Sequence, residues 1–255
     1  MIRLLLTKLK TKVKPATGFA NIFHLALLIT LPVVVFVLVR LQFVQLALIM
    51  VILSKWRMFA VRPRFWAANI RANAIDIIVG LSIVLFMAHS SSAISLQLVW
   101  AVLYGIWLIA IKPRSSLLFT SLQAAIGQLC GLMALYLTWA SGPLFGIVFL
   151  TGLICFLAAR HFFDSFNEPY ARLLAYLWGY FGAALAWLLG HWLLFYQIVS
   201  QPALLLCTLG YGLAVLYYLD HHGRLNKGLQ RQFVFVMLAI VLVVLSFSDW
   251  GDKAV

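Results

Sequence analysis

Long apolar segments recur along the whole chain and set the strongest limit on its fold. An α-helix needs about 20 apolar residues to cross the hydrocarbon core of a bilayer, and about nine segments meet or approach that length. They cover residues 20–39, 42–56, 74–89, 94–111, 116–139, 143–159, 173–197, 202–219 and 233–249. Charged residues make up only 10% of the sequence, against about 25% in a soluble domain. The sequence therefore predicts an all-α, polytopic bundle of about nine membrane-spanning helices, with short amphipathic helices at the membrane interface.

The connections between these segments are alternately rich and poor in basic residues. All but two of the 19 Lys and Arg residues fall on one side when the segments are threaded through a membrane; the exceptions are Arg40 and Lys253. Because cytoplasmic connections collect Lys and Arg, we expect the N-terminus inside, the C-terminus outside, and a multi-pass protein of the plasma (cytoplasmic) membrane. The net charge of +13 is then matched by a lipid bilayer with anionic headgroups on its inner face, and we expect no nucleic-acid partner.

Two basic stretches differ from plain linkers. Residues 1–16 alternate apolar and basic side chains, a pattern typical of an amphipathic segment that lies in the headgroup layer. Residues 55–73 form a basic interfacial loop anchored by aromatic side chains such as Trp56 and Trp66, and Pro63 is expected to break it into two pieces. We interpret residues 1–255 as a single integral membrane domain.

Small residues at helical spacing indicate where the segments pack closely. Lipid supplies no hydrophobic drive between helices, so association depends on side chains that let two backbones approach. The predicted packing residues on three consecutive segments are Gly127, Gly131, Gly142, Gly146, Gly182, Ala186 and Gly190. Gln97, Gln123 and Gln128 need hydrogen-bond partners in lipid and are expected to face the bundle interior.

The middle of each apolar segment is free of Asp, Glu, Lys and Arg. Asp76 begins segment 74–89 near Arg71, where a carboxylate would complement the positive end of the helix dipole and the basic loop. Ion-coupled transporters and proton pumps usually carry a charged residue at mid-membrane depth. If the protein is a transporter, we therefore expect an uncharged or amphipathic substrate.

Two connections on the basic side hold the candidate chemistry. The candidate catalytic residues are His161, Asp164, Glu168, Asp220, His221 and His222. If residues 160–168 are helical, the first three share one face. Together with His222 they could bind a divalent cation, or an imidazole and a carboxylate could act as an acid/base pair. The same carboxylates are equally well placed for ion pairs with Arg160, Arg172 and Arg224.

Three classes of function remain open. Cys130, Cys155 and Cys207 lie inside apolar segments without metal-binding spacing, so we read them as buried apolar side chains and predict no cofactor. Without an evident catalytic motif, we expect first a membrane-complex subunit or scaffold that contacts other membrane proteins. The alternatives are a transporter or flippase-like protein for an uncharged or amphipathic substrate, and a membrane enzyme acting on a lipid headgroup at the inner face.

Overall fold

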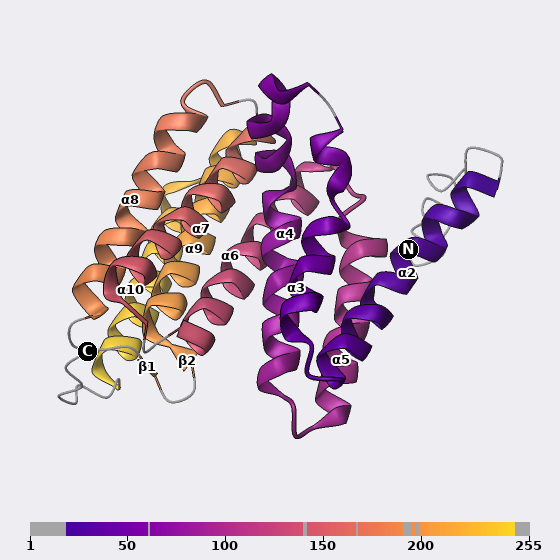
Figure 1. Cartoon of the computed structure of the whole chain (residues 1–255). Helices are drawn as coiled ribbons and strands as arrows, with labels where there is room; N and C mark the ends of the chain where they lie inside the picture. The colour runs from indigo at the N-terminus through magenta and orange to yellow at the C-terminus, as the bar shows by residue number, and fades with distance from the viewer. Residues whose placement is uncertain are drawn as a thin grey trace, which may run out of the picture.

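The fold is a bundle of antiparallel helices (Figure 1). A computed structural model describes residues 19–60, 62–139, 142–166, 168–190, 195–196 and 199–247, so the predicted amphipathic segment 1–16 lies outside the described residues. The α-helices of the described part are α2 (Phe19–Arg40), α3 (Val44–Leu53), α4 (Trp66–His89), α5 (Ile94–Ile106), α6 (Leu117–Trp139), α7 (Leu144–Asp164), α8 (Ala171–Gly190), α9 (Gln201–His221) and α10 (Lys227–Ser246). A short antiparallel hairpin, β1 (Phe195–Tyr196) and β2 (Val199–Ser200), precedes α9. The all-α prediction is confirmed for these ranges.

Seven helices of the described part are long and apolar enough to cross a membrane. They are α4 extended back to Pro63, α5 with its continuation to Ile111, and α6 to α10. Two further apolar stretches, Leu28–Arg40 in α2 and Val44–Leu53 in α3, are shorter. At 1.5 Å per residue, α3 is about 15 Å long, roughly half the thickness of the hydrocarbon core. The chain is thus a multi-pass membrane protein, and its predicted count of nine crossings depends on α2 and α3.

Helix α4 begins earlier than its apolar segment. The stretch from Trp66 to Asn73, expected in the interfacial loop, is already helical, and only the two 3₁₀ turns η1 (Trp56–Phe59) and η2 (Pro63–Phe65) precede it. Lipid limits the length of the apolar part of a helix, but a helical backbone can continue through polar residues into the interface. Asp76 is therefore inside the helix and not at its start, so the predicted role of the helix dipole is wrong.

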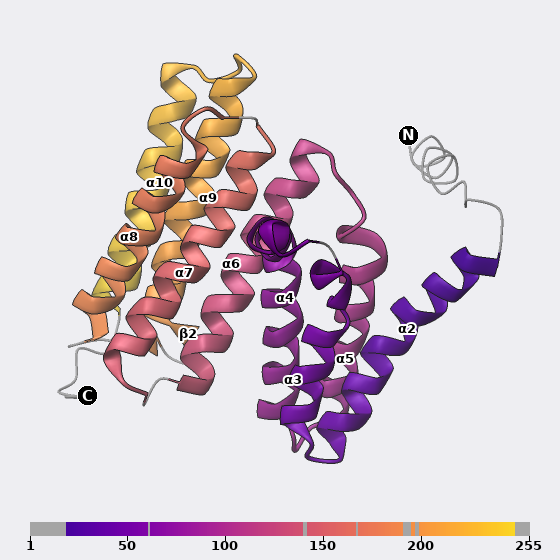
Figure 2. The same cartoon turned by 45° about the horizontal axis from the view of Figure 1, so that its top comes forward.

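The helices form two groups that meet at α6. Figure 1 shows α2, α3 and α5 around α4, with α7 to α10 on the other side of α6, and α6 packs against both α4 and α7. Figure 2 shows α2 diverging from its group toward its N-terminal end. One end of the bundle, the upper end in Figure 1, is called the basic end below. Helices α3, α7 and α9 finish there, and helices α4, α6, α8 and α10 begin there.

The most extensive helix contact joins α7 and α8 and depends on glycine. A β-carbon at Gly179 would lie 3.0 Å from the carbonyl oxygen of Gly152 and 2.9 Å from the β-carbon of Phe156. A β-carbon at Gly182 would lie 2.7 Å from the Sγ atom of Cys155. The two backbones are in contact at these positions, so a larger side chain has no room without a shift of the helices. Gly152 contributes to this contact although it stood outside the predicted set.

The other predicted packing residues take several positions. β-Carbons at Gly127, Gly131 and Gly190 would meet side chains of neighbouring helices at 2.8, 2.7 and 2.5 Å, and these neighbours are Ile75, Ile78 and Leu144. Ala186 is buried within the bundle. Gly142 and Gly146 pack instead on the Trp139 side chain at the α6–α7 connection, where β-carbons would lie 3.2 and 3.0 Å from its ring. The small residues of α6 and α8 thus face other helices, and those at the start of α7 fit a tryptophan.

The three glutamines face the interior, as predicted, and each has a hydrogen-bond partner. Gln97 donates to the carbonyl oxygen of Met87 at 3.0 Å. Gln128 donates to the carbonyl oxygen of Leu206 at 3.0 Å, and its own amide oxygen accepts from Trp178 Nε1, also at 3.0 Å. Gln123 joins the contacts at the basic end. These bonds link α4 to α5 and tie α6 to both α8 and α9, because a polar side chain in lipid needs an internal partner.

Candidate functional site

The two connections that carry the candidate residues lie next to each other at the basic end. His161 and Asp164 belong to the last turn of α7, Glu168 lies in the α7–α8 connection, Asp220 and His221 end α9, and His222 follows it. The Phe166 ring packs at 5.1 Å from both the Tyr217 and the His221 rings. The two connections are therefore neighbours, which the sequence left open, and an aromatic cluster lies at their contact.

His161 points toward α6. Its Nε2 atom lies 3.1 Å from Oε1 of Gln123, and Gln123 Nε2 donates to the carbonyl oxygens of Ile111 and Arg114 at 2.8 and 3.0 Å. Carbonyl groups at the end of a helical segment have no partner within the helix. The pair therefore satisfies the backbone at the end of the α5 continuation and links three segments of the bundle.

The acids take other partners. Asp164 Oδ1 pairs with Arg160 Nη2 at 2.9 Å, and its Oδ2 lies 4.0 Å from Nε of Arg71. Glu168 Oε2 accepts a hydrogen bond from the Tyr217 hydroxyl. These contacts are the ion-pairing alternative that the sequence left open, except that Arg71 and Tyr217 are partners it did not suggest.

The remaining candidates stay at the end of α9. His222 packs its ring on Tyr218 at 4.2 Å, and its Nδ1 atom lies 2.8 Å from the carbonyl oxygen of the same residue. Asp220 and His221 belong to the last turn of this helix. Within the described part of the chain, no group of three or more His, Cys, Asp and Glu side chains is arranged to hold a metal ion.

A buried charge cluster lies between α3, α4 and the end of α5, and the sequence interpretation missed its partners. The Asp76 carboxylate pairs through Oδ2 with Lys55, and with Lys112 Nζ at 2.5 Å. Its Oδ1 atom accepts a hydrogen bond from Trp107 Nε1 at 2.8 Å. The side chains of Asp76 and Lys55 are 7% and 8% exposed, and that of Lys112 is 32% exposed. The interfacial loop does supply a counter-charge, as expected, but through Lys55 and not through Arg71.

A π-helical turn brings two of these partners together. Residues Trp107–Ile111 continue α5 with wider turns, and the Lys112 amide donates to the carbonyl oxygen of Trp107 at 2.9 Å. In a regular α-helix two residues five apart point about 140° away from each other. The i→i+5 turn stacks them instead, so that Trp107 and Lys112 both reach the Asp76 carboxylate.

The position of the cluster along the bundle follows from α4. Asp76 lies 13 residues before the end of the helix at His89, a distance of about 20 Å along the axis. The helix extends about 15 Å in the other direction, from Asp76 back to Trp66, so the cluster lies within the bundle nearer its basic end. A buried carboxylate needs an internal partner, and Lys55 and Lys112 both supply one to Asp76.

The cluster carries a net positive charge, and burial changes the pKa of Lys55, the lysine that precedes α4. Burial lowers the pKa of Lys55 from 10.5 to about 8, although the Asp76 carboxylate acts in the opposite direction. Desolvation disfavours the charged form of any buried amine. The Asp76 carboxylate thus favours the protonated form of Lys55 against this desolvation.

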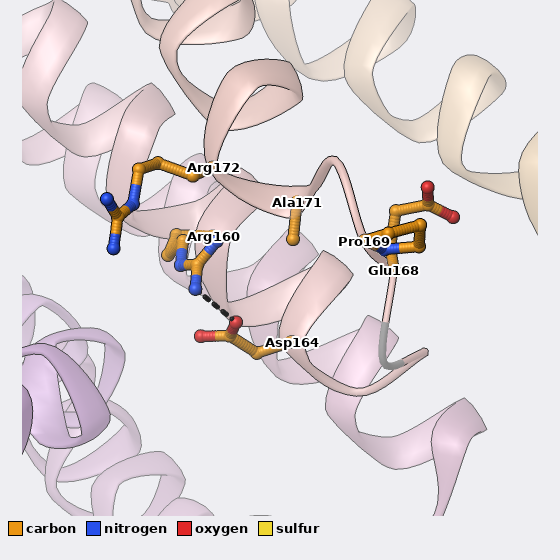
Figure 3. Close-up of a pocket in the computed structure, with 6 residues that line it drawn as sticks. All are labelled: Arg160, Asp164, Glu168, Pro169, Ala171 and Arg172. Atoms are coloured by element: carbon orange, nitrogen blue, oxygen red, sulfur yellow. Dashed lines mark ion pairs between the residues drawn. The ribbon is translucent and has the colours of Figure 1, made fainter.

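An open hollow of about 530 Å³ lies at the basic end beside the α7–α8 connection. Its lining residues are Arg160, Asp164, Glu168, Pro169, Ala171 and Arg172. Figure 3 shows the guanidinium groups of Arg160 and Arg172 on the same side as the Asp164 carboxylate, whereas the Glu168 carboxylate points the other way. The hollow thus presents two guanidinium groups and one carboxylate, which suits an anion better than a cation.

No protein-family model, curated protein or solved structure matches this chain.

Proposed function

We propose that the protein is a non-catalytic subunit or scaffold of a membrane complex in the plasma membrane, with its basic end in the cytoplasm. The observation that carries this proposal is the internal pairing of three acids in the described part of the chain. Asp76 pairs with two lysines, Asp164 with Arg160, and Glu168 with Tyr217. A catalytic acid or base needs a free position within reach of its substrate. Pairing of these carboxylates within the chain supports a structural role, and their dispersed partners argue against the enzyme alternative.

Helix α10 is the best place to look for a partner. Of the seven long helices in the described part, it has the smallest buried share, 6%. Phe235 and Leu242 are 71% and 62% exposed, whereas Met237 on the same helix is 9% exposed. A protein partner that covers this helix would make close contact with the first two residues and not with the third.

Site-specific photo-crosslinking in native membranes tests the proposal. With a photoreactive amino acid at position 235 or 242, we expect one discrete protein adduct common to both positions, and no such adduct from position 237. Mass spectrometry of the adduct identifies the partner. The second readout is co-purification of that partner with the chain that carries no photoreactive residue. Adducts with lipid alone at both exposed positions would refute the subunit assignment.

A transporter or flippase-like function is the second candidate, and one observation favours it. Ionisable residues inside a membrane bundle commonly mark a substrate path, and Lys55, Asp76 and Lys112 are such residues. We test it by reconstituting the purified chain in liposomes and following the transbilayer movement of a fluorescent phospholipid. Movement that is lost in the double variant Lys55→Met/Asp76→Asn, which leaves no buried charge without a partner, but kept in Asp164→Asn would support transport over scaffolding.

A further inference from the structure

We propose that the hollow beside the α7–α8 connection binds the phosphate group of an anionic phospholipid, with an acyl chain lying along the α7–α8 surface. This site goes beyond the scaffold assignment and does not depend on it. Its volume of about 530 Å³ is in the range of ordinary small-ligand pockets, about 300–1,000 Å³. Its two arginines, Arg160 and Arg172, are the charged groups best suited to a phosphate, because a guanidinium donates two parallel hydrogen bonds.

The local charge favours an anion. Arg71, Arg160 and Arg172 stand around one carboxylate, Asp164, which pairs with Arg160 at 2.9 Å and lies 4.0 Å from Arg71. Glu168 also lines the hollow, but its carboxylate is turned toward Tyr217 and away from the arginines (Figure 3). Three cations around one remaining acid leave an excess of positive charge.

Arg160 and Arg172 still have donors to offer. The Nε atom of Arg160 is buried and has no hydrogen-bond partner among the described residues, although its Nη2 atom is paired with Asp164. Arg172 is exposed in the first turn of α8. A buried donor without a partner costs about 1–3 kcal/mol. A phosphate in the hollow would accept first from the exposed Arg172 guanidinium, next to the positive end of the α8 dipole, and it would reach Arg160 Nε after a rotation of that side chain.

The surface toward the middle of the membrane is apolar and aromatic. Phe156 precedes Arg160 by four residues, and Tyr176 follows Arg172 by four, so both lie about one helical turn from the arginines toward the membrane centre. Their rings stack with centroids 4.9 Å apart. Tyr176 is 59% exposed, and its neighbour Leu173 is 56% exposed.

This order of groups matches a lipid and not a free anion. Guanidinium groups stand at the helix ends, where a phosphate lies, and an exposed aromatic and aliphatic surface continues beneath them, where an acyl chain lies. Free phosphate would contact only the guanidinium groups and not the aromatic and aliphatic surface. A lipid would use both parts, and the two can be separated experimentally.

The test is binding of dioctanoyl phosphatidylglycerol and dioctanoyl phosphatidylcholine to the purified full chain, measured by native mass spectrometry. We expect phosphatidylglycerol to bind at least about tenfold more tightly. Arg172→Gln should weaken that binding about tenfold, because one charge-assisted hydrogen bond is lost. Arg224→Gln, which removes an arginine of the same end from the α9–α10 connection, is the matched control and should change binding less than about twofold.

Further variants separate the lipid from other anions. Tyr176→Ala should weaken lipid binding severalfold, and Asp164→Asn should strengthen it, because the competing carboxylate charge is gone. Arg172→Gln removes an exposed side chain and should fold even if Arg160→Gln does not.

Three results would overturn the proposal. The first is equal binding of the two lipids, and the second is an equal effect of Arg224→Gln and Arg172→Gln, which would indicate diffuse charge. The third is displacement of the lipid by millimolar inorganic phosphate with no effect of Tyr176→Ala, which would assign the hollow to free phosphate.

Discussion

Replacing Asp76 by Asn tests the buried charge cluster most directly. The asparagine keeps the shape of the side chain and an oxygen that can accept the hydrogen bond from Trp107 Nε1. It removes only the negative charge that faces Lys55 and Lys112. Lys112 is 32% exposed and can turn toward water, whereas Lys55 is 8% exposed and cannot do so without a change of the loop.

The size of the effect follows from this burial. Two unit charges about 4 Å apart interact by about 4 kcal/mol at an effective dielectric constant of about 20. Removing one partner of a buried ion pair generally costs about 3–5 kcal/mol, because the other charge is left without compensation. We therefore expect Asp76→Asn to lower the free energy of unfolding by about 3–4 kcal/mol.

Reversible unfolding in mixed detergent micelles, followed by tryptophan fluorescence, measures this loss. Asp164→Asn is the matched control, because Asp164 is 43% exposed and surface pairs contribute at most about 1 kcal/mol. The double variant Lys55→Met/Asp76→Asn should recover most of the loss, since no buried charge then lacks a partner. A loss below about 1 kcal/mol for Asp76→Asn, or no recovery in the double variant, would refute the reasoning.

Three further results are expected from the same unfolding assay. Because the pKa of Lys55 is about 8 in the folded state and 10.5 in the unfolded state, the unfolded state binds more protons between these values. The free energy of unfolding should rise across that pH window by up to about 3 kcal/mol, and a Lys55→Met variant that lacks the rise would identify its source. Gly179→Ala should cost about 1–3 kcal/mol through overpacking of α7 against α8, while Gly105→Ala, with nothing within 4 Å of an added β-carbon, should cost nothing; equal effects would contradict the packing argument. Gln128→Leu should cost about 0.5–2 kcal/mol, because it leaves Trp178 Nε1 without its acceptor, and a neutral substitution would mean that the bond contributes little.

Hydropathy predicts the helices of this chain well, since segment length and apolar composition are local properties. Each of the seven long helices of the described part overlaps a predicted segment, although α8 ends at Gly190 and the predicted end of its segment at residue 197 is wrong, because Phe195–Tyr196 form a strand. The boundaries of α4 were not predictable in the same way. The apolar pattern marks where lipid surrounds the helix, from about Ala74, whereas the backbone is helical from Trp66. Because the start of the apolar pattern was taken as the start of the helix, Asp76 was expected at the helix N-terminus. The helix in fact begins ten residues earlier, at Trp66.

The partners of the charged residues depend on which helices pack together, and a single sequence does not contain that information locally. Lys55 and Lys112 are far from Asp76 along the chain, and they meet it only because α3, α4 and the end of α5 are neighbours. His161, Asp164 and Glu168 were expected to share a helical face. His161 and Asp164 do share the last turn of α7, but the helix ends at Asp164, so Glu168 lies beyond it and bonds to Tyr217 of α9 instead.

The π turn at the end of α5 makes the cluster sensitive to the length of the chain as well as to the identity of its residues. Trp107 and Lys112 share one carboxylate only because five residues fill a turn that normally holds fewer. Deleting one residue between them would favour an ordinary α-helix and shift the register at which the following lysine meets Asp76. A homologue that keeps the cluster should therefore preserve this spacing even where the apolar side chains Leu108 to Ile111 vary freely. Insertions and deletions at this point of the chain would mark a lineage in which the buried charge has been lost or balanced in another way.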